Sequence, residues 1–146
     1  MSEYVDKVQA KCDAFADRVV KLNDYLLDQS ANKKPEVLKK TANGKSIFRK
    51  PIPVYLQAVA NICNQLLRAG TSIGANNSEA TSAISKADYK AKSYIALKEA
   101  RESLYWINLL HRNGYLEEKE YDSIYADADE LVRMLVSRCK KLDSLG

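Results

Sequence analysis

The chain has few of the residues that interrupt helices and no long apolar run. Its 146 residues include only 5 glycines and 3 prolines, a scarcity that favours long uninterrupted helices. The length suits one domain with a hydrophobic core of its own. No apolar run approaches the roughly 20 residues that a membrane-spanning helix needs, so we expect no membrane partner.

Secretion signals and disulfide patterns are also missing. The N-terminal stretch MSEYVDKVQAKCDAF lacks the basic and then apolar segments of a secretory signal. The 3 cysteines, Cys12, Cys63 and Cys139, are an odd number without short spacing, as is typical of reduced thiols. We therefore expect a cytoplasmic protein whose cysteines lie in the core.

Histidine is scarce as well, which excludes most metal chemistry. His111 is the 1 histidine, so the sequence has neither zinc-ligand spacing nor the paired Glu-x-x-His pattern of a di-iron bundle. The stretch GTSIG matches the GxSxG pattern of a hydrolase nucleophile, with Ser72 at its centre, but helical periodicity continues through it. The same stretch lacks the lysine of a P-loop. We therefore expect no enzyme activity, no catalytic residue, no metal and no cofactor.

What is present is helical periodicity. Apolar residues recur three and four positions apart in four segments, at about 5–26, 53–80, 86–112 and from about 121 onward. Ser85 and Asp88 predict a capping box at the start of the third segment, and Gly114 predicts its end. The sequence therefore predicts an all-α protein, a single domain over 1–146 that forms an up-down-up-down antiparallel four-helix bundle.

Two of these segments carry more than a simple apolar stripe. Gly70 and Gly74 lie one turn apart inside the second segment, where each costs about 1 kcal/mol relative to alanine, so we expect a neighbouring helix to approach them closely. The opposite side, with Arg68 and Glu79, is either a solvated face or a subunit contact. The third segment has a second apolar strip, which predicts that this helix is covered on two sides: Tyr94, Ile95, Tyr105 and Leu109.

Positive charge is concentrated between the first two predicted helices. The formal net charge is +4, and a connector at about 28–52 carries seven cations: Lys33, Lys34, Lys39, Lys40, Lys45, Arg49 and Lys50. Cations on the third predicted helix complete the candidates for nucleic-acid binding: Lys86, Lys90, Lys92 and Arg101. Lysine and arginine bind phosphates without a sequence motif, so the sequence favours the phosphate backbone of RNA or DNA as a partner.

The stretches QLLRAGTSIGANNSEA and SKADYKAKSYIALKEARESLYWINLL resemble the bacterial proteins encoded in intervening sequences of 23S ribosomal RNA genes, also called S23 ribosomal proteins. The resemblance covers about 15–27 and 64–140. The residues that match the family's characteristic positions are Arg68, Gly70, Ser72, Gly74, Asn76, Glu79, Lys98, Glu99, Glu102 and Trp106. Two departures are Ser78, where many relatives carry arginine, and the connector, which is longer than the family's usual first turn.

The resemblance implies a bundle that assembles as a homopentameric ring. A related branch, the accessory variability determinants of diversity-generating retroelements, works with a reverse transcriptase and binds nucleic acid. By this analogy of fold we expect a non-enzymatic, oligomeric accessory protein that binds RNA. The alternative is a protein-binding adaptor for a reverse transcriptase or another ribonucleoprotein component.

Overall fold

Four α-helices make up the described part of the protein. The computed structural model describes residues 2–32 and 56–144, and no strand occurs in them. The helices are α1 (Ser2–Asn32), α2 (Gln57–Thr81), α3 (Lys86–Arg112) and α4 (Glu118–Ser144). The prediction of an all-α, four-helix protein is therefore confirmed for these residues.

The helix ends agree with the sequence prediction at α3 and differ elsewhere. α3 covers the predicted 86–112. α1 continues to Asn32, so the predicted start of the connector near 28 is wrong, because the stretch DQSAN contains neither proline nor glycine to end a helix. α4 begins at Glu118, about one turn before the predicted 121, and its first turn contains Glu118 and Glu120, since acids in a first turn stabilise a helix. The predicted start of the second helix near Pro53 lies outside the described residues.

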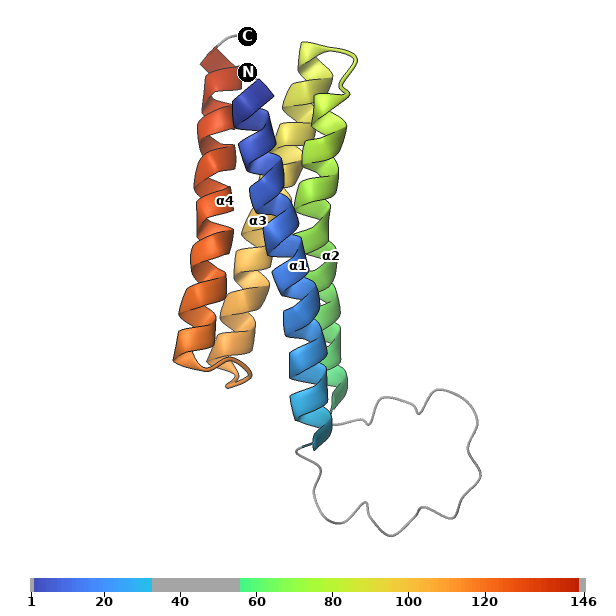
Figure 1. The fold of residues 1–146 in the computed structure, drawn as a ribbon, viewed down its shortest axis with the longest axis vertical. Coiled ribbons are helices and arrows are strands. Elements are labelled where there is room, and N and C mark those ends of the chain that lie inside the picture. The colour runs from blue at the N-terminus through green and yellow to red at the C-terminus, as the bar shows by residue number, and fades with distance from the viewer. Residues whose placement is uncertain (1, 33–55, 145–146) are drawn as a thin grey trace, which may run out of the picture.

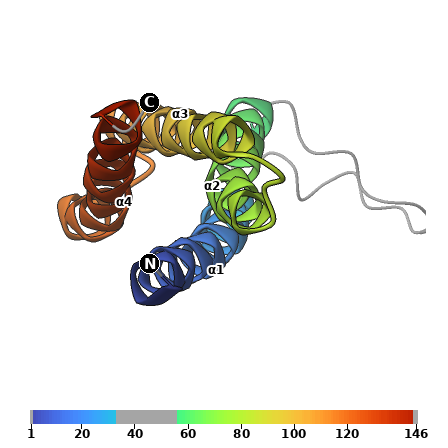
Figure 2. The ribbon, with the colours of Figure 1, turned by 90° about the horizontal axis from the view of Figure 1, so that it is seen from above.

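Consecutive helices run antiparallel, and each packs against the next (Figure 1). α2 has extensive contacts with α1 and α3, and α3 with α4, whereas α1 and α4 touch each other much less. Seen end on, the helices form an arc that is open between α1 and α4 (Figure 2). Phe15 and Leu135 are among the largest fully buried side chains of the core, and all three cysteines are buried.

Short turns with defined caps connect α2, α3 and α4. Ser85 Oγ accepts a hydrogen bond from the Asp88 amide at 3.0 Å, which is the first half of the predicted capping box. The Asp88 carboxylate accepts from the Ile84 amide at 3.2 Å, one residue before the position that a standard capping box uses. After α3, Gly114 has a φ of +76°, the left-handed conformation that favours glycine. These turns are short enough to hold successive helices side by side.

α1 closely approaches the backbone of α2 at two glycines. A methyl group on Gly70 would lie 3.1 Å from Val19 Cγ2 and 3.4 Å from Phe15 Cε1. A methyl group on Gly74 would lie 3.3 Å from Cys12 Cβ. These distances are shorter than ordinary van der Waals contact, so the lack of a side chain at both positions is what allows α1 to pack this closely.

A chain of polar side chains, buried at Arg138 and Asn77 and half-buried at Gln9, joins α4, α2 and α1. Arg138 Nη1 donates to Asn77 Oδ1 at 2.6 Å, and Asn77 Nδ2 donates to Gln9 Oε1 at 2.7 Å. Tyr89 of α3 lies beside the same guanidinium, whose Cζ is 5.9 Å from the ring centroid. Arg138 and Asn77 are buried, so these contacts compensate for the loss of water around a charged group.

We expect Gly70→Ala to lower the free energy of unfolding by about 1 kcal/mol or more. The contact with the buried, β-branched Val19 outweighs a gain in helix propensity of about 1 kcal/mol, because Val19 cannot rotate away. Urea denaturation followed by circular dichroism measures the change. In a Val19→Ala background the same substitution is expected to be neutral or stabilising. A single variant that is more stable than the parent would contradict the close packing.

Candidate functional site

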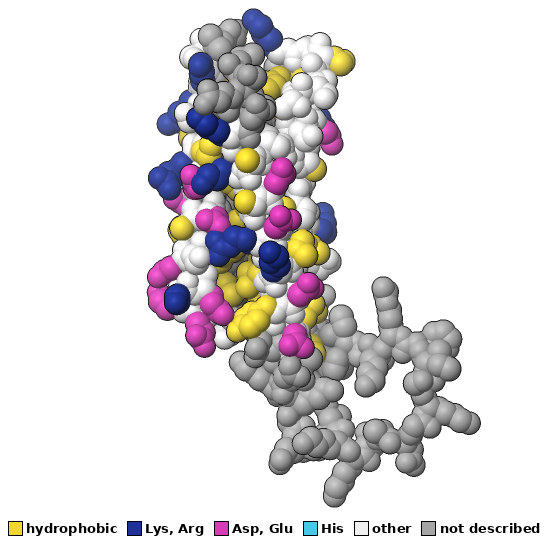
Figure 3. All heavy atoms as spheres, in the orientation of Figure 1, with side chains coloured by type: hydrophobic (Ala, Val, Ile, Leu, Met, Phe, Trp, Pro, Cys, Tyr) yellow, Lys and Arg dark blue, Asp and Glu magenta, His cyan; other side chains and the backbone are white. Residues whose placement is uncertain are grey.

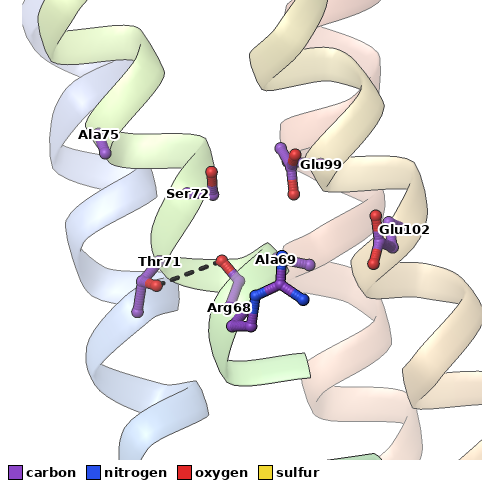
Figure 4. A pocket seen from close by; sticks show the side chains of 7 residues that line it. All are labelled: Arg68, Ala69, Thr71, Ser72, Ala75, Glu99 and Glu102. Atoms are coloured by element: carbon purple, nitrogen blue, oxygen red, sulfur yellow. Dashed lines mark hydrogen bonds between the residues drawn. The ribbon is translucent and has the colours of Figure 1, made fainter. Parts of the chain in front are cut away.

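The residues of the family motif gather on the outer side of α2 and α3. Four of them, Arg68, Ser72, Glu99 and Glu102, line an open cavity of about 430 Å³, which is completed by Ala69, Thr71 and Ala75. Figure 4 shows Ser72 of α2 and the two glutamates of α3 facing the gap between these helices. We call these seven residues, with the exposed Ile95 and Tyr105 of α3, the α2–α3 face.

The cavity exists because α2 presents small side chains at this place. Ala69, Ser72 and Ala75 recur three positions apart, so they leave the space next to α3 unfilled. Glu99 and Glu102 stand on the opposite wall. Removal from water raises the pKa of Glu99 and the charge of Glu102 raises it further, whereas Arg68 and Lys98 oppose the shift. A hydrogen-bond donor brought into the cavity by a partner would stabilise this carboxylate.

The charged groups of the α2–α3 face are held by bonds within their own helices. Arg68 Nη1 donates to Gln65 Oε1 at 3.1 Å, and Glu102 Oε1 accepts from Trp106 Nε1 at 3.1 Å. Neither bond connects α2 to α3, so both charged groups remain at the surface. Ile95 is 40% exposed and Tyr105 is 53% exposed, which adds apolar area to a polar surface. This combination suits contact with another macromolecule.

The other motif residues have structural roles or lie at the edge of this face. Gly70 and Gly74 point toward α1. Asn76 Nδ2 donates to the carbonyl oxygen of Ser72 at 2.9 Å. Glu79 forms an ion pair with Lys92 of α3, and Lys98 is exposed. The motif therefore has residues on two sides of α2. Its glycines allow close packing against α1, and its polar residues lie on the outer surface.

The predicted nucleic-acid-binding residues of α3 do not form one patch. Lys90 pairs with Asp143 of α4 at 2.9 Å, and Tyr94 Oη donates to the same carboxylate at 2.6 Å. Lys92 instead pairs with Glu79 on the α2 side. Lys86 and Arg101 are exposed. The seven predicted cations between positions 33 and 50 lie outside the described residues.

The excess positive charge of the chain comes from the segment between α1 and α2. Residues 33–50 hold seven of the 23 lysines and arginines but one of the 19 acids, so the rest of the chain has 16 cations against 18 anions. Figure 3 shows both signs on the described helices, with Lys and Arg toward the C-terminal end of α4 and Asp and Glu toward its N-terminal end. The helices therefore offer phosphate little net attraction.

A second cavity, which we did not predict from the sequence, lies between α1 and α4. Its volume is about 440 Å³, and we call it the α1–α4 groove after its lining residues: Arg18, Lys21, Leu22, Tyr25, Lys119, Glu120, Ser123 and Ile124. The sequence offered one indication of this groove: Tyr25 is an aromatic residue that lies beside the apolar stripe of α1 and not on it. Arg138 was also not predicted, although its spacing from Leu135 and Leu142 places it on the buried stripe of α4.

Residues 2–32 and 56–144 contain neither a group of metal ligands nor a membrane-spanning helix. No three His, Cys, Asp or Glu side chains of these residues are grouped so that they could hold a metal ion. None of their helices is long and apolar enough to cross a membrane.

Comparison with known proteins identifies the family of this four-helix chain. The model of the family named 23S rRNA-intervening sequence protein matches residues 53–137, which include α2, α3 and most of α4. No curated protein matches the chain.

A solved structure extends the similarity over almost the whole chain. It is the crystal structure, at 1.70 Å resolution, of a protein of unknown function from the S23 ribosomal protein family of Bacteroides thetaiotaomicron VPI-5482. The TM-score is 0.71 and 34% of residues are identical, over 94% of this chain and 98% of that chain. The chain therefore belongs to the 23S rRNA-intervening sequence protein family.

Two carboxylates with opposite pKa shifts predict opposite effects of pH on stability. The pKa of Glu99 is raised in the folded protein, so the ionised carboxylate destabilises the fold as pH rises. Glu99→Gln should therefore raise the melting temperature at pH 7 and have less effect near pH 4, where the carboxyl is largely protonated. Hydrogen bonds from Tyr94 and then Lys90 lower the pKa of Asp143, so its stabilising effect is present at neutral pH and is lost in acid. Asp143→Asn should therefore lower the melting temperature at pH 7.

Thermal unfolding of both variants, followed by circular dichroism between about pH 3 and 8, checks these signs. A decrease for Glu99→Gln at pH 7 would show that the cavity does not destabilise that carboxylate.

Proposed function

We propose that this protein is a non-enzymatic, oligomeric accessory protein that binds RNA through its phosphate backbone. The observation that supports this most directly is the separation of charge: the segment 33–50 carries the net positive charge, and the rest of the chain has a slight excess of acids. Cations on the described helices are commonly matched by acids, as Lys90 is by Asp143 and Lys92 by Glu79. A segment rich in unmatched cations is what phosphate binding requires.

Binding of this kind depends on charge and salt more than on base sequence. Each phosphate that a lysine or arginine neutralises releases counterions, so affinity falls as salt concentration rises. Phosphate contacts orient a protein on RNA but carry little sequence information. In an oligomer the basic segments would be repeated, and their fields would add.

The α2–α3 face is the surface that we propose joins one copy to another. It combines exposed Ile95 and Tyr105 with Arg68 and Glu102, whose bonds stay within their own helices. Arginine and carboxylates on neighbouring walls of one cavity can pair with the opposite charges of a second copy. The resemblance to the family implies five copies in a ring. The same face could instead bind a different protein such as a reverse transcriptase, which is the adaptor alternative.

RNA affinity across a salt series tests the role of the basic segment. Reversing three of its cations, Lys39→Glu, Lys40→Glu and Lys45→Glu, is expected to weaken binding of a labelled single-stranded RNA and to reduce the salt slope by about 2. Fluorescence anisotropy between about 50 and 200 mM salt measures both quantities.

A matched variant controls for total charge. Arg112→Glu, Lys140→Glu and Lys141→Glu make the same change of charge at exposed sites on α3 and α4. This variant is expected to keep most of the affinity and the parent salt slope. Equal losses in the two variants would show that the segment has no special role, and unchanged binding by the first would refute the proposal.

Light scattering tests the oligomer separately. The parent is expected to be oligomeric at micromolar concentration, and Ile95→Asp with Tyr105→Asp is expected to be monomeric because both charges would be buried in the contact. Val20→Asp introduces a charge at a site on α1 that is 44% exposed, and it should leave the oligomer intact. A monomeric parent, or a double variant that still associates, would exclude this face as the contact.

A further inference from the structure

The α1–α4 groove has an apolar floor that reaches the surface. Leu22 and Tyr25 of α1 and Ile124 of α4 form this floor, and Tyr25 is 46% exposed. In Figure 3 hydrophobic side chains are visible between α1 and α4 in the lower half of the view, beside Lys and Arg. A half-exposed aromatic ring at the bottom of an open groove can pack against another flat ring.

The groove lies next to the ion pairs that connect α1 and α4. Lys11 pairs with Glu130 at 2.9 Å, and Arg18 binds Asp127 and Ser123, with 2.8 Å between Arg18 Nη2 and Ser123 Oγ. Beyond Arg18, toward the C-terminal end of α1, the lining consists of the apolar floor and of three charged residues, Lys21, Lys119 and Glu120. The groove therefore lies between two packed helices, and these ion pairs bound it at one end.

Cations stand on both walls of this apolar floor. Lys21 belongs to α1 and Lys119 to α4, and in the described part of the chain neither is engaged in a hydrogen bond or an ion pair. These two lysines outnumber the single acid of the lining, Glu120, while Arg18 is paired with Asp127. The lining therefore complements a ligand that carries a negative charge next to a flat apolar part.

The Glu120 carboxylate lies near the aromatic ring of the floor. Its negative charge, followed by burial and a hydrogen bond to the same carboxylate, raises the pKa of Tyr25. The hydroxyl therefore stays protonated at neutral pH. Tyr25 is half-exposed, so a ligand in the groove can reach its ring.

We propose that the α1–α4 groove binds one nucleotide of single-stranded RNA. The base packs on Tyr25, Leu22 and Ile124, and the adjoining phosphates lie between Lys21 and Lys119. Aromatic stacking flanked by cations is the usual way in which proteins hold single strands, whereas a base inside a duplex cannot reach such a floor. This inference rests on the proposed function, since it names the kind of RNA that the protein holds.

The place of the groove along α1 agrees with this role. Tyr25 lies seven residues before Asn32, the last residue of α1, which corresponds to about 10 Å along a helix. The basic segment starts directly after Asn32. The groove therefore lies close to the residue at which the basic segment begins in the chain.

A comparison of two ligands with the same backbone isolates the base. The parent is expected to bind an oligouridine about tenfold more tightly than an abasic ribose-phosphate oligomer of equal length. Tyr25→Ala should remove this preference, whereas Tyr25→Phe should keep it because the ring is retained. Lys21→Gln with Lys119→Gln should weaken binding of both oligomers and leave binding of duplex RNA unchanged. Circular dichroism checks that each variant is folded.

The outcomes separate this inference from the proposed function. If the charge-reversed segment abolishes RNA binding but Tyr25→Ala keeps the preference for oligouridine, the groove is not the site and the proposed function stands. If the parent binds no RNA, both are wrong. Binding of a fluorescent fatty acid that oligouridine does not displace, with its loss in Tyr25→Ala, would assign the groove to an amphiphilic carboxylate and overturn the inference.

Discussion

The close approach of α1 to Gly70 and Gly74 determines how the remaining helices are arranged. Because α1 lies against the bare backbone of α2, it contacts α2 far more than α4. The side between α1 and α4 is therefore closed by polar side chains, such as Lys11 with Glu130, instead of by a continuous apolar core. The α1–α4 groove lies on this side, next to the pair of Arg18 and Asp127.

The polar chain of Arg138, Asn77 and Gln9 connects α2 to α4, two helices without direct packing against each other, and continues to α1. α2 and α4 lie on opposite sides of the core, yet Asn77 accepts a hydrogen bond from Arg138 and donates one to Gln9. A buried arginine that lost this acceptor would cost about 1–3 kcal/mol. A register in which the three side chains do not meet is therefore strongly disfavoured, so the network selects one arrangement of the helices.

Periodicity and local chemistry allowed the helices and several of their ends to be predicted, because both depend on neighbours in sequence. Ser85 caps α3 through a residue three positions away, and Gly114 ends it through its own φ. Arg138 shows where prediction from the sequence fails. Its spacing along α4 indicated a buried position, whereas its charge indicated an exposed one. Its hydrogen-bond partner Asn77 is 61 positions away in the sequence. The division of Lys90 and Lys92 between two neighbouring helices was likewise decided by acids on α4 and α2, which spacing along α3 does not reveal.

The chain has 1 tryptophan, and its position gives the molecule an internal optical probe. Trp106 is half-buried beside the α2–α3 face, where its indole donates to Glu102 and its ring lies edge-on to Tyr105, with 4.9 Å between centroids. The α1–α4 groove has tyrosine but no tryptophan. Tryptophan fluorescence therefore reports on contacts at the α2–α3 face and is insensitive to direct contacts in the α1–α4 groove. Association and ligand binding can thus be followed separately in the unlabelled protein.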